Sequence, residues 1–92
     1  MQCKVKRDML FYHPTKEEPK ASLILKAGTI VRVLIPSEMS DKEKKWLSTN
    51  RRNDPPSKKR VAFRWEGRFR TAFINDDLAP HAIGGVITNR KW

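Results

Sequence analysis

Short runs of apolar side chains, separated by charged and polar ones, make up the first third of the chain. Residues 3–12 begin with alternating polar and apolar positions and end in the apolar cluster Met-Leu-Phe-Tyr. Residues 22–26 form a second short apolar run, and residues 29–35 are rich in the β-branched side chains that pack well on a pleated sheet. These three segments are therefore predicted to be strands. An exposed loop is predicted over residues 14–20, and a turn at Gly28, where a positive φ has no steric cost.

A different pattern begins after Pro36, which lacks a backbone N–H and is expected to end the third strand. Ser40 stands three residues before Glu43, and acidic side chains give way to lysines further along. This order matches a capping box and the helix dipole, so the sequence predicts one short helix over about residues 41–47. Residues 49–60 contain no apolar side chain and are predicted to form a long, mobile, basic loop.

Residues 60–73 show two alternating stretches on either side of Glu66-Gly67, which is typical of a β-hairpin. A two-residue loop would place arginines opposite aromatic rings on one face. A three-residue loop over residues 66–68 separates the faces, because it gathers the apolar side chains and leaves Arg64 opposite Arg70 on the other side. A slip of one residue would turn every side chain over. The three-residue loop is the prediction, with the cross-strand pairs Trp65–Phe69, Phe63–Thr71 and Val61–Phe73.

The last part of the chain is predicted to contain a tight turn over residues 74–80, capped by Asn75 or Asp76, with Leu78 in the core. Residues 82–88 are predicted to supply a final short strand. A chain of this length cannot bury two hydrophobic cores, so residues 1–92 are expected to form one domain. The expected fold class is mainly β: a small, strongly bent barrel of about five strands with one short helical insert.

Residues 25–33, residues 61–73 and the turn at 76–78 together resemble an SH3-like barrel. Ribosome-associated and transcription-associated barrels of this class, such as those with the KOW motif, bind RNA or acidic partners, so the resemblance implies partners of that kind. The strand Gly28-Thr-Ile-Val31 is also similar to the Gly-Asp-Ile-Val strand of toxin endoribonucleases of the MazF type, with Thr29 in place of the aspartate. That second resemblance implies RNA cleavage as an alternative activity.

The excess of basic over acidic side chains indicates which class of partner the protein binds. The 92-residue chain has 20 Lys and Arg against 10 Asp and Glu, a formal charge of +10 at pH 7. Such a surplus favours a polyanionic partner, which can be nucleic acid, an acidic protein or an anionic membrane surface. Between Arg51 and Arg70 there are eight cations and two acids. Six of the eight are arginines, whose planar guanidinium binds phosphate bidentately and stacks on bases.

The predicted function is therefore that of a small basic accessory protein that binds DNA or RNA, mainly through phosphate contacts. Trp46 and Trp92 are candidate stacking platforms, or else core residues. The alternative is a protein-interaction module or inhibitor, of a kind that phages and plasmids encode, whose basic face docks on an acidic host protein. The sequence leaves the oligomeric state open. The predicted binding residues are the eight cations Arg51, Arg52, Lys58, Lys59, Arg60, Arg64, Arg68 and Arg70.

The sequence disfavours a membrane-spanning, secreted, disulfide-bonded or metal-binding protein. No apolar run reaches the roughly 18 residues that cross a bilayer, and the first residues lack the apolar stretch of a secretory signal, so a cytoplasmic protein is expected. Cys3 is the only cysteine, and neither His13 nor His81 has a partner at ligand spacing. An intrachain disulfide is therefore excluded, and no metal or other cofactor is expected.

No conventional catalytic constellation is present, so the protein is not expected to be an enzyme. Asp76 and Asp77, near His81, are interpreted as turn formers that bind their own backbone. Phosphodiester cleavage by electrostatic stabilisation alone would need only hydrogen-bond donors. The residues that would serve it are Arg64, Arg70 and Thr71.

Overall fold

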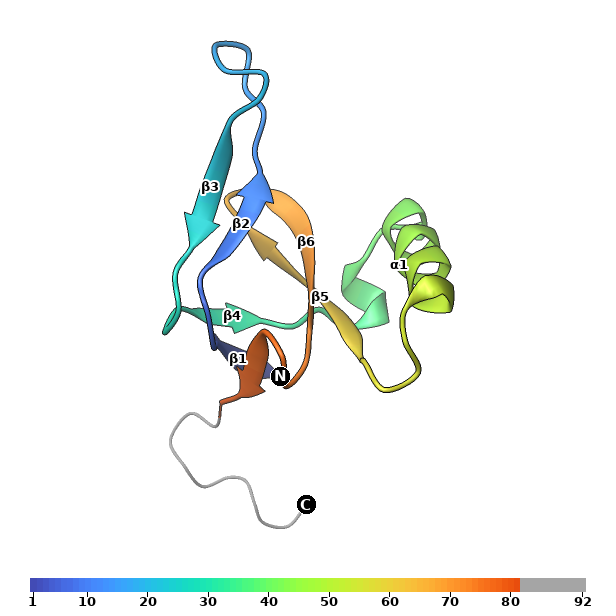
Figure 1. The fold of residues 1–92 in the computed structure, drawn as a ribbon. Helices are drawn as coiled ribbons and strands as arrows, with labels where there is room; N and C mark the ends of the chain where they lie inside the picture. The colour runs from blue at the N-terminus through green and yellow to red at the C-terminus, as the bar shows by residue number, and fades with distance from the viewer. Residues whose placement is uncertain (82–92) are drawn as a thin grey trace.

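The computed structural model describes residues 1–81, and its fold is mainly β (Figure 1). The described elements are seven short strands, one 3₁₀ helix and one α-helix. In chain order they are β1 (Gln2–Val5), β2 (Met9–Tyr12), β3 (Ser22–Leu25), β4 (Ile30–Arg32), η1 (Pro36–Glu38), α1 (Asp41–Asn53), β5 (Arg60–Trp65), β6 (Arg68–Phe73) and β7 (Leu78–Pro80).

The strands described within residues 1–81 form three antiparallel sheets. β1 is the central strand of the order β4-β1-β7, while β2 pairs with β3 and β5 pairs with β6. A bridge between Val33 and Phe63, and a 2.8 Å hydrogen bond from Leu34 N to the Ala62 carbonyl, join the end of β4 to β5. The strands thus follow one another as β7-β1-β4-β5-β6, and the β2–β3 hairpin projects from this run (Figure 1). Within residues 1–81 no ladder closes the run into a barrel.

The predicted first strand is in fact two strands in different ladders, β1 and β2. The chain leaves the first ladder where Lys6, Arg7 and Asp8 follow one another, and Lys6 N donates to the Asp77 carbonyl at 2.8 Å instead. Three successive charged side chains cannot be buried, so the chain bends there. The segments predicted as the second and third strands are confirmed as β3 and β4, although β4 is shorter than predicted. Gly28 between them has a φ of +95°, as the predicted turn requires.

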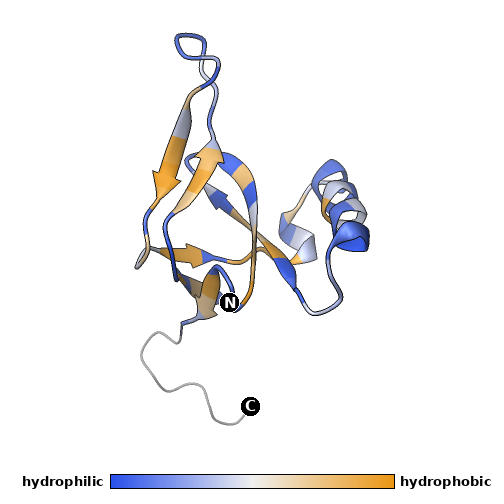
Figure 2. Ribbon diagram, in the orientation of Figure 1, coloured by the Kyte–Doolittle hydropathy of each residue, from blue (hydrophilic) through white to orange (hydrophobic). Residues whose placement is uncertain are grey.

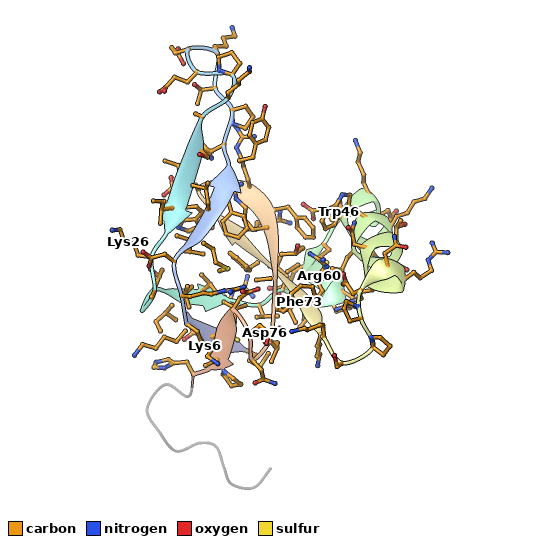
Figure 3. The ribbon with its side chains drawn as sticks, viewed as in Figure 1. Lys6, Lys26, Trp46, Arg60, Phe73 and Asp76 are labelled. Atoms are coloured by element: carbon orange, nitrogen blue, oxygen red, sulfur yellow. The ribbon has the colours of Figure 1, made fainter. Side chains whose placement is uncertain are left out.

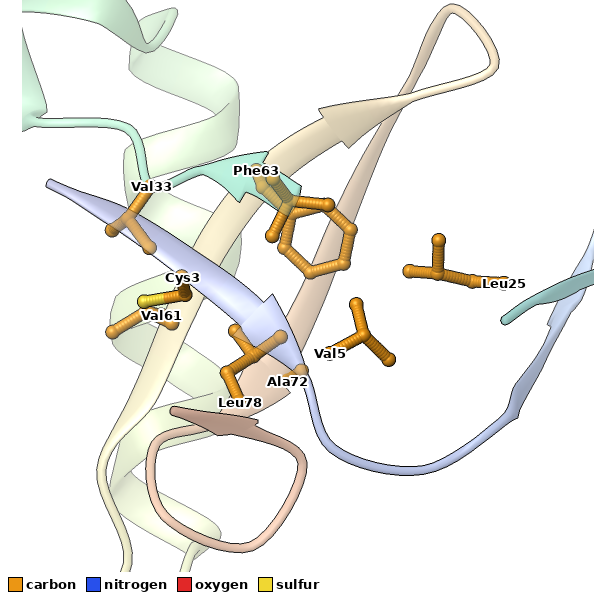
Figure 4. Close-up of a cluster of buried hydrophobic side chains, with 9 residues drawn as sticks. Cys3, Val5, Leu25, Val33, Val61, Phe63, Ala72 and Leu78 are labelled. Carbon is orange, nitrogen blue, oxygen red and sulfur yellow. The ribbon is translucent and has the colours of Figure 1, made fainter. Parts of the chain in front are cut away.

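The main core lies where β1, β4, β5, β6 and β7 meet (Figure 4). Phe63 is its largest member and is completely buried. Burial also raises the pKa of the Cys3 thiol, so this side chain packs as a small apolar group. The buried members are Cys3, Val5, Leu25, Val31, Val33, Val61, Phe63, Ala72 and Leu78.

The β5–β6 hairpin has a two-residue loop, so the predicted three-residue loop is wrong. Glu66 and Gly67 have φ values of +54° and +70°, the conformation of a type I′ turn that fits the twist of a hairpin. The apolar and aromatic side chains of the hairpin are therefore divided between its two faces. The observed pairs are Trp65–Arg68, Arg64–Phe69, Phe63–Arg70, Ala62–Thr71, Val61–Ala72 and Arg60–Phe73.

Helix α1 begins as predicted and ends later. Ser40 and Glu43 form the expected capping box: Glu43 N donates to Ser40 Oγ at 3.1 Å, and Ser40 N donates to Glu43 Oε1 at 2.9 Å. The helix then continues to Asn53, so the predicted loop over residues 49–60 is wrong in its first five positions and spans only residues 54–59. A single buried side chain, Leu47, anchors the helix in a second small cluster with Leu34 and Ala62. Most residues of α1 are hydrophilic (Figure 2).

The segment after β6 supplies the last described strand. Residues 78–80, predicted as part of a turn, pair with β1 as strand β7. Leu78 is buried in the core, as predicted. The preceding turn is held by Asp77, whose Oδ2 accepts from Phe73 N at 3.0 Å, and not by Asn75 or Asp76. The strand predicted over residues 82–88 lies outside the described residues.

Candidate functional site

Three contacts at regular intervals hold α1 against β5. Four helical residues rise about 6 Å and two strand residues rise about 6.6 Å, so contacts four apart on the helix meet positions two apart on the strand. Two of the predicted phosphate-binding arginines, Arg51 and Arg64, therefore make contacts that hold α1 against β5. From the start of α1 to its end, the contacts join Glu43 to Arg64, Leu47 to Ala62, and Arg51 to the Arg60 carbonyl.

The Arg64 guanidinium is bound at both ends of its fork. It donates to the two carboxylate oxygens of Glu43 at 2.8 and 2.9 Å, and to the Glu38 carbonyl at 3.2 Å. These Arg64 hydrogen bonds, with one from Ser40 N, lower the pKa of the Glu43 carboxyl to about 2. Arg64 is therefore neutralised within the chain.

Arg60 and Lys58 are also paired with acids. Arg60 binds both carboxylate oxygens of Asp54, at 2.7 and 2.8 Å, and its guanidinium lies 4.6 Å from the centre of the Phe73 ring. The Arg60 side chain lies beside Phe73 in Figure 3. The contact with Arg60 lowers the pKa of Asp54, and the ion pair with Lys58 lowers the pKa of Asp76.

Arg70 faces the interior, although it was predicted to lie on the outer face with Arg64. Its side chain is only 7% exposed, and its guanidinium lies 5.2 Å from the centre of the Phe11 ring and 5.6 Å from that of Trp65. It donates to the Tyr12 carbonyl at 2.6 Å and contacts His13 Nδ1 at 2.9 Å. Burial lowers the pKa of this guanidinium. Arg70 is thus a core residue that joins β6 to β2.

The other four predicted cations form no ion pair with an acid within residues 1–81. Arg51 and Arg68 donate to backbone carbonyls, those of Arg60 and Pro14, whereas the side chains of Arg52 and Lys59 make no hydrogen bond or ion pair in that part of the chain. The eight predicted residues therefore do not form one binding face.

The residues considered for phosphodiester cleavage do not converge. Arg64 and Arg70 lie on opposite faces of the hairpin, and Thr71 Oγ1 accepts a hydrogen bond from Arg60 Nη1 at 2.9 Å. Asp77 is buried and accepts from Arg7 Nε at 2.8 Å, which supports its interpretation as a structural residue. Among residues 1–81 no three His, Cys, Asp or Glu side chains are placed to hold a metal ion.

The outward surface of α1 carries two cations, Lys42 and Lys45, that were not among the predicted binding residues, together with Arg52, which was. Helical spacing places Lys42, Lys45 and Arg52 on the side opposite Leu47, and all three are exposed. None of them forms an ion pair within the described residues. The 3.6-residue periodicity already places Lys42 and Lys45 together within the predicted helix, and Arg52 joins them because the helix continues to Asn53.

Next to this stripe lies a depression, here named the aromatic hollow, between β2, β6 and the first half of α1. Its larger part has a volume of about 580 Å³, and a smaller part of about 360 Å³ adjoins it at Trp46 and Phe69. Trp46 faces β6 across it in Figure 3. The only acid in the lining is Glu43, which Arg64 neutralises. The lining residues are Phe11, Tyr12, Pro14, Lys42, Glu43, Trp46, Arg68, Phe69, Arg70 and Thr71.

The exposed side chains of the aromatic hollow are held in place. Trp46 is 47% exposed, and its ring meets the Phe69 ring edge-to-face at 6.0 Å between centres. Tyr12 is 63% exposed, and its hydroxyl donates to the Pro19 carbonyl at 2.8 Å. Arg68 Nη2 donates to the Pro14 carbonyl at 2.7 Å. These contacts orient two aromatic faces and one cation without covering them.

The free edge of β6 borders the same hollow. The two-residue loop makes Phe63–Arg70 and Val61–Ala72 the hydrogen-bonded pairs of the hairpin. The backbone N–H and C=O groups of Phe69 and Thr71 consequently point away from β5, and nothing else in residues 1–81 binds them. The aromatic hollow thus combines aromatic faces, cations and backbone hydrogen-bonding groups.

Comparison of the chain with protein-family models, with curated proteins and with solved structures finds no match. None of the helices in residues 1–81 has the length and apolar character needed to cross a membrane. The function is therefore inferred from the side chains and backbone groups exposed at the aromatic hollow and on α1.

Proposed function

We propose that this protein binds nucleic acid through the aromatic hollow and the outward stripe of α1. The observation that carries the proposal is the exposure of two oriented aromatic rings, Trp46 and Tyr12, beside cations that no acid within residues 1–81 neutralises. Aromatic side chains interleaved with unpaired cations are the combination that binds bases and phosphates together.

The distribution of charge supports this surface over the loop and hairpin. Six of the ten acids form ion pairs within residues 1–81, and three of those pairs use Lys58, Arg60 and Arg64. The cations that remain for a ligand beside the aromatic rings are Lys42, Lys45 and Arg68, with Arg52 further along α1. A formal charge of +10 also speeds association with a polyanion.

The proposal includes an SH3-like barrel as the fold and the cytoplasm as the compartment. The bent run of five strands, the helical insert between β4 and β5, and the tight turn before β7 support the barrel. A single cysteine, buried as a thiol, supports a reducing compartment.

Salt-dependent binding tests the function. Affinity is measured by fluorescence anisotropy for labelled DNA and RNA strands of about 12 nucleotides, within the usual length range for such domains, at several salt concentrations. The double variant Lys42→Gln/Lys45→Gln should lower the slope of log affinity against log salt by about 1.4 for single strands, because each phosphate contact contributes about 0.7.

A matched control removes two exposed lysines elsewhere. Lys4 on β1 and Lys26 after β3 are distant from Trp46, as the position of Lys26 in Figure 3 illustrates. Lys4→Gln/Lys26→Gln carries the same change in net charge and should leave the slope within about 0.5 of the wild-type value. Equal effects of the two double variants would mean that net charge alone drives binding. Failure of every oligonucleotide to bind at low salt would reject the proposal and favour an acidic protein as the partner.

A further inference from the structure

We infer that the aromatic hollow selects single-stranded nucleic acid, by stacking unpaired bases on Trp46 and Tyr12. This inference rests on the proposed function and specifies its substrate class. It goes beyond phosphate binding, because a site that only neutralises phosphates needs no aromatic surface.

The two rings have the properties of stacking platforms. Each is about half exposed or more, and each is held by a contact that leaves a ring face open: Trp46 by the edge-to-face contact with Phe69, and Tyr12 by the hydroxyl bond to the Pro19 carbonyl. Ordering a mobile aromatic side chain lowers affinity, and here that ordering precedes binding. Every base has a π face, so such platforms accept any sequence.

The free backbone edge of β6 favours unpaired bases for a separate reason. The N–H and C=O groups of Phe69 and Thr71 lie at the border of the hollow and have no partner within residues 1–81. The Watson–Crick edges of splayed bases can donate to and accept from such groups, whereas in a duplex those edges are already paired. Stacking and edge contacts therefore both require a base that has left its stack.

The cations of the hollow suit a short strand. Lys42 lies in the smaller part, Arg68 in the larger part, and Lys45 on the neighbouring outer surface of α1. Three charges around a concave aromatic surface can follow the phosphates of a few nucleotides. A duplex would touch these cations without placing a base inside the hollow.

The test compares a single strand, in DNA and RNA forms, with a duplex of the same length and sequence. The wild-type protein should bind at least one of the two single strands more tightly than the duplex. Trp46→Ala should weaken single-strand binding by roughly 10-fold to 100-fold while leaving the salt slope unchanged, because the variant removes stacking and no phosphate contact. Trp46→Phe should retain most of the affinity, and Tyr12→Phe, which keeps the ring, serves as the matched control for Tyr12→Ala.

The outcomes separate this inference from the proposed function. Duplex binding equal to or tighter than single-strand binding, or a Trp46→Ala variant with unchanged single-strand affinity, would overturn the stacking inference and leave nucleic-acid binding in place. Absence of binding to every nucleic acid would remove both, and an extended peptide added to the β6 edge would then be the better occupant.

A second measurement uses the unaltered chain and so does not depend on how a variant folds. A single strand containing 4-thiouridine is irradiated in the presence of the protein, and the cross-linked residue is identified by mass spectrometry. Cross-links to Trp46, Tyr12 or Phe69 support the inference. Cross-links confined to residues 54–59 or to the β1 and β3 side of the molecule contradict it.

Discussion

Replacing Arg70 by alanine should destabilise this protein far more than the same replacement of Arg68, two residues earlier on β6. Arg70 is buried beside the rings of Phe11 and Trp65, while Arg68 is exposed and makes one hydrogen bond to a carbonyl. The two arginines lie on the same strand and the same face, so the comparison isolates burial.

The expected loss of stability in Arg70→Ala follows from the contacts of the Arg70 guanidinium. Its contacts with the Tyr12 carbonyl and His13 Nδ1 are hydrogen bonds from a charged donor, worth about 1.5 to 3 kcal/mol each. The two cation–π contacts add about 1 kcal/mol each. Burying a guanidinium without a carboxylate partner costs several kcal/mol in lost hydration. The net loss for Arg70→Ala is therefore about 3 kcal/mol, or roughly 12 to 24 °C in Tm for a domain of this size.

Urea denaturation followed by circular dichroism measures both free energies of unfolding. Arg68→Ala should lie within about 0.5 kcal/mol of the wild type, as exposed substitutions do. Arg70→Lys should lose about 2 kcal/mol, because an ammonium group keeps the charge but lacks the planar fork that stacks on aromatic rings and donates several hydrogen bonds. If Arg70→Ala and Arg68→Ala had equal stabilities, the two-residue hairpin loop and the inward position of Arg70 would both be refuted.

Two further predictions concern the capping contact of α1 and the hairpin turn. The pKa of Glu43 is about 2 in the folded protein against an ordinary 4.5, so the folded state binds fewer protons and the stability from this group is lost as the pH falls from about 4.5 to 2. Glu43→Gln should remove about one proton from the uptake on unfolding in that range, measured by urea titrations at several pH values; an unchanged pH dependence would contradict the Arg64 contact. Gly67→Ala should cost about 1 kcal/mol from its φ of +70° alone, because nothing lies within 4 Å of the added methyl group. An alanine variant as stable as the wild type would show that the turn has another conformation.

Local sequence signals predicted the elements that depend on local chemistry. The capping box at Ser40 and Glu43, the positive φ at Gly28 and the strands β3 and β4 all follow from a few neighbouring residues. The mainly β class followed in turn from the number of short apolar runs.

The hairpin register could not be predicted, because the alternation of Arg and aromatic residues fits both registers. The choice depends on Arg70, which is stable inside only because Phe11 and Tyr12, far away in sequence, supply a ring and a carbonyl. The length of α1 was missed for a similar reason. Its second half contains no apolar residue, and the Arg51 contact with the Arg60 carbonyl is a tertiary interaction.

The candidate site likewise depends partly on local sequence and partly on tertiary contacts. The excess of arginine predicted a basic surface, but a count of charges cannot show which cations meet an acid after folding. Arg60 and Arg64 are paired because α1 and the turn at Asp54 bring carboxylates to them. Within residues 1–81, Lys42 and Lys45 have no acid partner because they lie on the side of α1 that faces away from β5.

Chemical-shift mapping tests the central claim most directly. Two-dimensional ¹H–¹⁵N spectra of the labelled protein are recorded during titration with a single strand of about 12 nucleotides, within the usual length range for such domains. If single strands bind at the aromatic hollow, the largest chemical-shift changes should occur there, in the Trp46 indole N–H and the amides of Tyr12, Phe69 and Thr71. Shifts centred on Lys4 and Lys26, or on the loop over residues 54–59, or no shifts at all, would contradict it.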